Sequence, residues 1–265
     1  MSLCSTLCAT FVAEAQPRFH LLTNELTRRI GAHDTALISA LESVGRYTRK
    51  DGRTGGTAYL LDVPHPDGRA CMLTAHHVAL HEKQSVLGDR VTFYVGGASS
   101  LQVDANIIAV RAADAEIDYA LLEVTLPPAL RHLIGVRYAE SGHTPLIEGT
   151  RLFNPSFPRI WPDEKAVVGQ RLVSGPTSRR LYRAALAGES TPKMLQVGRA
   201  EGWQIEGFEV ASLPQQNGSS GSPVFDTNTH RFVGMLTAGG GLDSAMIRPA
   251  KTIFDDIARR LNTTR

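Results

Sequence analysis

A short stretch between Gln216 and Phe225, with the sequence QNGSSGSPVF, constrains this chain more than any other. A serine hydroxyl is a weak nucleophile that needs a base to activate it and hydrogen-bond donors for the oxyanion it creates. Gly218 lets the backbone N–H groups of residues 218 and 220 approach one point, and Gly221 permits a tight bend that exposes the Ser220 hydroxyl. The plainer interpretation is a glycine-serine turn that joins two strands, and the stretch by itself does not separate the two.

Two upstream segments favour the catalytic interpretation. Residues 73–78 read LTAHHV, with histidines at the end of an apolar run, and residues 117–122 read IDYALL, with an aspartate at the start of one. The order along the chain is therefore histidine, aspartate, serine. α/β-Hydrolases and subtilisins carry the same three residue types in other orders.

The three segments resemble the T-A-x-H, D-x-A-L-L and G-x-S-G-x-P motifs of chymotrypsin-like serine proteases. Glutamyl endopeptidases, viral proteases and HtrA-type proteases share such G-x-S-G-x-P loops. The resemblance implies that Ser220 is the nucleophile, His77 the general base and Asp118 the carboxylate that orients it. The N–H groups of Gly218 and Ser220 would form the oxyanion hole.

Each assignment has neighbouring candidates. The family spacing selects His77 over His76, and on a strand these two side chains would point to opposite sides. Among Asp114, Glu116 and Asp118, only Asp118 directly precedes an apolar strand.

The resemblance also implies an all-β fold of two antiparallel β-barrels of the chymotrypsin type, with a C-terminal helix and a short N-terminal helical extension. We expect the extension at residues 1–35, the first barrel at 36–126, a linker at 127–145, and the second barrel with the C-terminal helix at 146–265. Near-helical spacing predicts a helix within residues 20–30 and another over 250–261. The remaining strand-like segments are 36–47, 55–63, 70–74, 91–95, 101–110, 119–124, 151–154, 166–172, 195–200, 208–213, 223–225 and 232–236.

The charge composition limits the kinds of partner that we expect. With 28 basic and 26 acidic residues the formal charge is +2, which predicts neither a nucleic-acid nor a membrane partner. No run approaches the ~18 apolar residues that span a bilayer, so we expect a soluble, cytoplasmic protein, unless residues 1–15 act as a weak signal peptide for secretion.

Cys4, Cys8 and Cys71 form no disulfide framework, and no HExxH-like spacing predicts a metal site. We expect no cofactor and a protein or peptide substrate; the oligomeric state stays open.

The residue before the nucleophile bears on activation. Digestive trypsin-like relatives carry an aspartate there, which pairs with a newly cut N-terminal ammonium and shapes the oxyanion loop. This chain has Ser219, which cannot form that ion pair. The resemblance therefore implies activity without precise N-terminal cleavage.

The resemblance also locates the primary specificity pocket. Its walls would be residues 213–217, including Pro214 and Asn217, and Thr237, Ala238 and Gly239, with Asp243 and Ser244 near its base. Trypsin-like relatives place an aspartate where Pro214 stands, and glutamyl endopeptidases a histidine where Leu236 stands. We therefore expect a pocket for a medium-sized apolar side chain, unless the Asp243 carboxylate turns inward and favours Arg or Lys.

The sequence thus predicts a serine endopeptidase that works through a Ser-His-Asp triad and an acyl-enzyme. Two alternatives stay open. One is a catalytically degenerate binding module with a protease fold, and the other is an esterase that uses the same triad.

Overall fold

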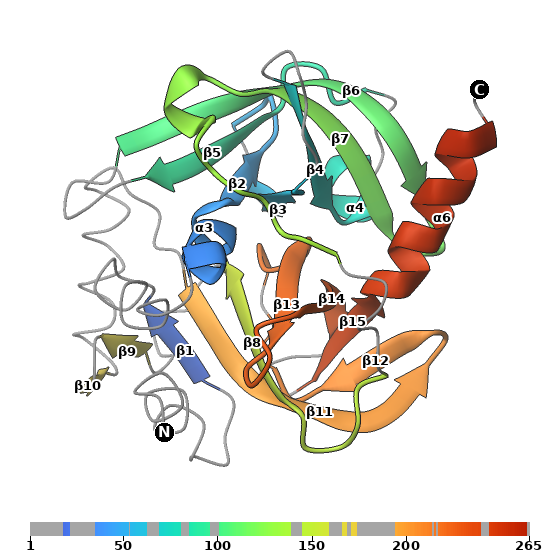
Figure 1. Cartoon of the computed structure of the whole chain (residues 1–265). Helices are drawn as coiled ribbons and strands as arrows, with labels where there is room; N and C mark the ends of the chain where they lie inside the picture. The colour runs from blue at the N-terminus through green and yellow to red at the C-terminus, as the bar shows by residue number, and fades with distance from the viewer. Residues whose placement is uncertain are drawn as a thin grey trace.

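The computed structural model describes residues 18–21, 35–52, 54–62, 69–80, 85–95, 101–138, 145–158, 166–168, 171–173, 194–213, 215, 217–239 and 244–263. Within them, two closed six-stranded antiparallel barrels lie one above the other, and a C-terminal helix runs along one side (Figure 1). None of the described helices is both long and apolar enough to cross a membrane.

The first barrel contains six strands in the spatial order β2-β3-β4-β7-β6-β5, closed by pairing of β2 with β5. The buried residues of these strands form the core of the barrel, where Tyr47, Tyr59 and Phe93 are fully buried. The strands are β2 (Val44–Thr48), β3 (Thr54–Leu60), β4 (Arg69–Thr74), β5 (Arg90–Val95), β6 (Leu101–Asp114) and β7 (Tyr119–Thr125).

The second barrel has the order β8-β11-β12-β15-β14-β13 and closes where β13 pairs with β8. Its interior is aliphatic, with Leu152, Leu236 and Ile247 fully buried. The strands are β8 (Arg151–Ser156), β11 (Met194–Ile205), β12 (Phe208–Ala211), β13 (Ser222–Asp226), β14 (Phe232–Gly239) and β15 (Ala245–Pro249).

Three short strands extend the second sheet beyond the barrel, at one side of the molecule (Figure 1). β1 (Arg18–Leu21) runs antiparallel to β11 and places Phe19 opposite Gln196. β9 (Ala166–Val168) pairs with β1, and β10 (Arg171–Val173) pairs with β9. An N-terminal segment thus lies directly beside β11.

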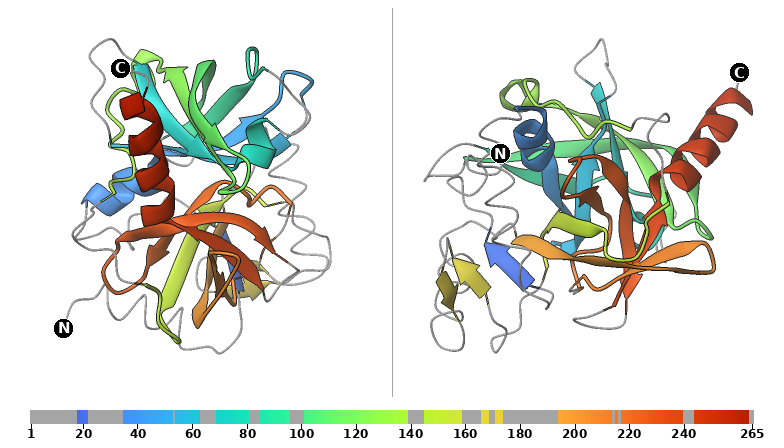
Figure 2. Two further views of the ribbon diagram at one scale, coloured as in Figure 1. Left: turned by 90° about the vertical axis from the view of Figure 1, so that its right-hand side faces the viewer. Right: turned by 60° about the horizontal axis from the view of Figure 1, so that its bottom comes forward.

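Helices are few among the described residues, namely α3 (Thr35–Glu42), α4 (His76–Ala79), the 3-10 turn η1 (Pro128–Leu130) and α6 (Ala250–Thr263). α6 buries Ile253 and Ile257 four residues apart and exposes charged side chains elsewhere, as expected of an amphipathic helix. It contacts β14 and β15 of the second barrel and β6 of the first (Figure 2). α6 therefore joins the two barrels.

The predicted fold class is confirmed, and three segments differ from the expectation. Residues 36–42 were expected to open a strand, but they lie in α3, whose alanine, leucine and glutamate residues favour a helix and whose Ala40 and Leu41 are buried. Of the helix expected within residues 20–30, residues 20 and 21 lie in β1, and the others lie outside the described residues. The single segment 166–172 is two short strands, β9 and β10, at the sheet edge.

Candidate active site

His77 contacts Asp118 through both its backbone and its ring. The backbone N–H of His77 donates to Asp118 Oδ1 over 3.1 Å, and Nδ1 lies 3.0 Å from Oδ1 and 2.9 Å from Oδ2. A proton on Nδ1 satisfies this contact and leaves Nε2 of the neutral ring as an acceptor. The Asp118 side chain is 16% exposed, whereas that of His77 is 42% exposed, so the ring remains accessible at its other edge.

The two adjacent histidines follow a strand and lie in a helical turn rather than on the strand itself. β4 ends at Thr74, Ala75 keeps an extended backbone, and His76 and His77 begin the single turn of α4. On a helix, neighbouring side chains diverge by about 100°, so only one of the two histidines faces Asp118.

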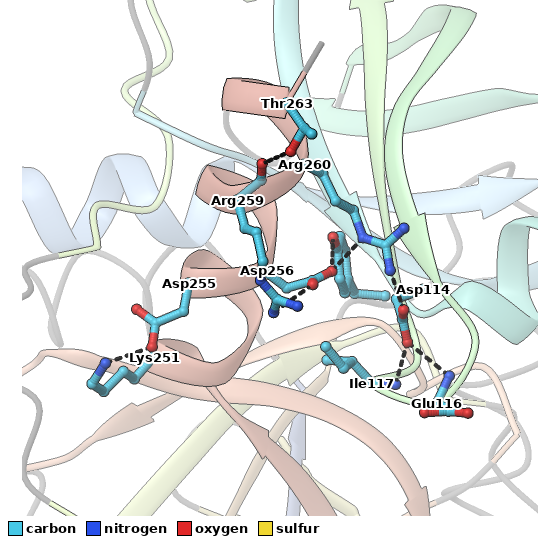
Figure 3. Close-up of polar contacts among 10 residues, drawn as sticks. Asp114, Glu116, Ile117, Lys251, Asp255, Asp256, Arg259, Arg260 and Thr263 are labelled. Atoms are coloured by element: carbon cyan, nitrogen blue, oxygen red, sulfur yellow. Dashed lines mark hydrogen bonds and ion pairs between the residues drawn. The ribbon is translucent and has the colours of Figure 1, made fainter.

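Asp118 is the last residue of the tight turn between β6 and β7 and has a left-handed backbone, with φ of 63°. Aspartate tolerates this region better than most residues. Asp114, the rival acid, has another role, since its Oδ1 accepts the N–H groups of Glu116 at 2.9 Å and Ile117 at 2.8 Å (Figure 3). Asp114 shapes the turn, and Asp118 contacts the histidine.

The loop that carries Ser220 lies against the first barrel beside α4. Thr57 on β3 donates from its N–H to the carbonyl of Ser220 over 2.9 Å and from Oγ1 to the carbonyl of Gly218 over 2.7 Å. A Cβ at Gly221 would lie 2.3 Å from the Thr57 oxygen and 2.9 Å from the Ala75 nitrogen. Only glycine fits there, and this close approach brings Ser220 to the segment that begins α4.

The backbone of this loop suits an anion. Gly218 and Gly221 have φ of 98° and 87°, which other residues rarely adopt. Within the part of the chain that is described, the N–H groups of Gly218 and Ser220 donate to no protein acceptor. Ser220 as a whole residue is only 9% exposed, although the sequence predicted an exposed hydroxyl.

The described residues contain no hydrogen bond between Ser220 and His77. Bonds of this kind are often long in free enzymes and tighten when the substrate binds. The structure thus brings the histidine and the aspartate into contact, and it brings the serine loop beside them.

Two buried amide side chains form hydrogen bonds to the loop that carries Ser220. Asn154 on β8 and Gln196 on β11 are opposite each other in the strand register, and both are fully buried. Gln196 Nε2 donates to Ser219 Oγ over 2.8 Å, and Asn154 Nδ2 donates to Ser222 Oγ over 2.8 Å and to the Pro223 carbonyl over 2.7 Å. Ser222 Oγ in turn donates to the Ser219 carbonyl over 2.5 Å.

Sequence reasoning missed both amides. The available signal was a lone amide inside an apolar run, Leu152-Phe153-Asn154 and Leu195-Gln196-Val197, since a buried amide must find hydrogen-bond partners. Nothing in the sequence named those partners.

The expected specificity residues are partly described. Four of them are exposed, namely Asn217, Ala238, Gly239 and Ser244. Thr237 is buried, and its Oγ1 donates to the Met246 carbonyl over 3.3 Å. Pro214 and Asp243 lie outside the described residues. A Cβ at Gly239 would lie 1.8 Å from Oε1 of Gln215, so the Gln215 amide covers that glycine. Gln215 belongs to the range 213–217 but had no assigned role.

Comparison with known families matches residues 56–235 to the trypsin-like peptidase domain. The chain belongs to this family. The match spans the His77, Asp118 and Ser220 segments, and it makes the chain a peptidase by family. No curated protein sequence matches the chain.

Solved structures of proteases share the fold. An inactive mutant of Rv3671c from M. tuberculosis is 15% identical, with a TM-score of 0.53 over 88% of this chain and 93% of that one. The serine endoprotease from Yersinia pestis is 12% identical, with a TM-score of 0.57 over 87% and 66%. The HtrA-type protease AlgW with a tripeptide is 15% identical, with a TM-score of 0.54 over 87% and 64%.

Proposed function

We propose that this trypsin-like peptidase is a serine endopeptidase that hydrolyses peptide bonds through an acyl-enzyme. The observation that carries the proposal is the pair of contacts between His77 and Asp118 beside a loop that presents Ser220 between two left-handed glycines. The solved proteases of the same fold agree with this reaction class.

In the proposed reaction, Ser220 Oγ attacks the carbonyl carbon of the scissile bond while His77 Nε2 accepts its proton. Asp118 holds the proton on Nδ1 and stabilises the imidazolium that forms. The N–H groups of Gly218 and Ser220 donate to the oxyanion, a contribution of about 3–4 kcal/mol per donor in comparable sites.

The tetrahedral intermediate collapses when the imidazolium returns the proton to the leaving amine, which departs and leaves an ester on Ser220. Water then enters and attacks the ester carbonyl carbon while His77 accepts one of its protons. The second tetrahedral intermediate releases the carboxylic acid when the bond between this carbon and Ser220 Oγ breaks. Proton transfer back to Ser220 restores the free enzyme.

The test is covalent labelling with a fluorophosphonate probe, followed by hydrolysis of a peptide library. We expect labelling of the wild type, none of Ser220→Ala, and strongly reduced labelling of His77→Ala. Ser85→Ala is the matched control, because it removes a serine hydroxyl at the exposed surface of the first barrel and leaves the nucleophile and its loop intact.

The outcomes also separate the alternatives. A folded wild type that reacts with no probe and cleaves no peptide would favour a binding module with a protease fold. Labelling together with hydrolysis of esters but of no peptide would favour an esterase.

A further inference from the structure

Arg248 on β15 is a buried cation, with 5% of its surface exposed. Its guanidinium carbon lies 3.4 Å from the centre of the Phe208 ring, so the planar group stacks on that ring. Burying a charge is costly unless it is well paired and hydrogen bonded. Its partners therefore show what this arginine does.

Four backbone carbonyls accept the guanidinium hydrogen bonds. Nε donates to Ile117 over 2.8 Å and Nη2 to Glu116 over 2.8 Å, while Nη1 donates to Gly207 over 3.0 Å and to Glu206 over 3.3 Å. Two of these carbonyls belong to the turn between β6 and β7 of the first barrel. The other two belong to the hairpin between β11 and β12 of the second barrel. Arg248 therefore fixes a first-barrel turn to the second barrel.

That turn is the one that carries Asp118. Asp114 Oδ1 holds the N–H groups of Glu116 and Ile117, and Arg248 holds their carbonyls. The N–H and carbonyl groups of both residues before Asp118 are thus hydrogen bonded. From the outer side, Arg260 of α6 bonds the second carboxylate oxygen of Asp114 (Figure 3).

The left-handed backbone of Asp118 depends on this arrangement. Such a conformation persists where the surroundings over-determine it. If the carbonyls of Glu116 and Ile117 were released, the turn could relax and rotate the Asp118 carboxylate away from His77. Electrostatic attraction also favours this arrangement. Burial lowers the pKa of Arg248, but the negative charges of Asp118 and Asp114 oppose that shift, so both carboxylates attract the guanidinium.

We propose that Arg248 is a positioning residue for the reaction, because it holds the turn that aims Asp118 at His77 and ties this turn to the second barrel. This inference rests on the proposed peptidase function, and it does not require Arg248 to touch the substrate.

The test compares the wild type with Arg248→Met, which keeps an unbranched apolar stem and removes the hydrogen-bond donors. Misplacing a catalytic group by about 1 Å can cost about 100-fold in rate, so we expect kcat to fall about 10–100-fold with KM little changed. Arg248→Lys, which keeps the charge and some donors, should recover part of the loss. Arg111→Met is the matched control, since it removes a cation paired with the buried Glu123 on the first barrel. We expect it to retain wild-type kcat.

A second measurement does not need activity. In protein labelled with ¹⁵N-histidine, the Nδ1 proton of His77 should give a deshielded NMR signal that His77→Ala and Asp118→Ala remove. We expect this signal to be lost or moved in Arg248→Met and unchanged in Arg111→Met. If the wild type proves inactive, the proposed function fails, whereas this signal still decides the role of Arg248.

Wild-type kcat together with an unmoved His77 signal in folded Arg248→Met would overturn the proposal. So would equal losses in Arg248→Met and Arg111→Met. If Arg248→Met cannot be obtained folded, Arg248→Gln is measured in the same way, and the same outcomes decide.

Discussion

Gln196 donates a hydrogen bond to the hydroxyl of Ser219 over 2.8 Å, and both residues are fully buried. Where the resemblance places the aspartate of digestive trypsin-like proteases, this chain has a neutral serine bonded to a neutral amide. Replacing Gln196 by leucine leaves the Ser219 hydroxyl without its donor, and an unsatisfied buried group costs about 1–3 kcal/mol. We predict a loss of this size in the free energy of unfolding, together with a lower kcat.

Urea unfolding and steady-state kinetics measure the two effects. Gln102→Leu is the control, because Gln102 is exposed on β6, and neither quantity should change. A Gln196→Leu enzyme with unchanged kcat would mean that the loop needs no support from β11.

Activity should not require a new N-terminus, since Ser219 offers no carboxylate to an N-terminal ammonium. We predict equal kcat/KM for the full chain and for chains that begin at residues 16, 17 and 18, all of which keep β1. An ammonium partner would demand one exact starting residue. Activity confined to a single start would contradict the prediction, whereas equal gains from all three would indicate only the removal of a blocking segment.

Asp118→Asn should remove most of the activity and little of the stability. Asparagine also tolerates a left-handed backbone, so the turn should keep its shape. Its amide cannot hold the proton on His77 Nδ1 as a carboxylate does, and the equivalent change in a well-studied triad lowers kcat about 10⁴-fold. Single-turnover kinetics measure the loss. Asp114→Asn, which keeps an oxygen for the turn, should lose far less, and the reverse ranking would identify Asp114 as the catalytic acid.

Specificity should be soft and apolar. In an apolar pocket one methylene changes rates only about 10–200-fold, so a peptide library should show cleavage after several medium-sized apolar residues. The Gln215 amide that covers Gly239 should limit the size of the accepted side chain. Cleavage confined to sites after Arg or Lys, and abolished in Asp243→Ala, would replace the apolar pocket by an acidic one.

Asp256 on α6 should make stability depend on pH. It accepts hydrogen bonds from Tyr119 at 2.7 Å and from Arg260 at 2.6 Å, and it pairs with Arg259. Burial by itself raises the pKa of Asp256, but these bonds and the charges of both arginines lower it overall. The folded pKa is therefore below the unfolded value of about 3.9. The stabilisation is complete above that value and is lost as the pH falls through the folded pKa.

We predict that Asp256→Asn lowers the free energy of unfolding by about 1.5–3 kcal/mol near neutral pH, and that the difference from wild type shrinks toward pH 3. Urea unfolding across this range measures it. Asp255→Asn is the matched control, because Asp255 pairs with Lys251 at the exposed surface, where such pairs contribute little. A difference that grows as the pH falls would have the wrong sign.

The sequence predicted the parts of the fold and the candidate site that short segments encode. His77, Asp118 and Ser220 each lie in a run of about six residues with characteristic neighbours, so their candidate roles could be stated before the structure. Gln196 and Asn154 could not be connected to the loop in advance, because their partners are 23 and 68 residues away. The same holds for Arg248, which bonds carbonyls 131 and 132 residues earlier in the chain. Helix α3 was misread because its apolar run is followed closely by a strand, and so short a run does not distinguish a helix from a strand.

Thr57 bonds the Ser220 loop of the other barrel twice, and its Oγ1 also accepts the N–H of Phe157 over 3.1 Å. Neither barrel therefore holds the whole candidate site, so the rate of hydrolysis should depend on how the two barrels are docked. A compound that separates β3 from the 218–221 loop should inhibit hydrolysis without contacting the Ser220 hydroxyl, and it should therefore act as a non-competitive inhibitor. Two fragments divided in the linker would each be inert and would regain activity only on reassociation.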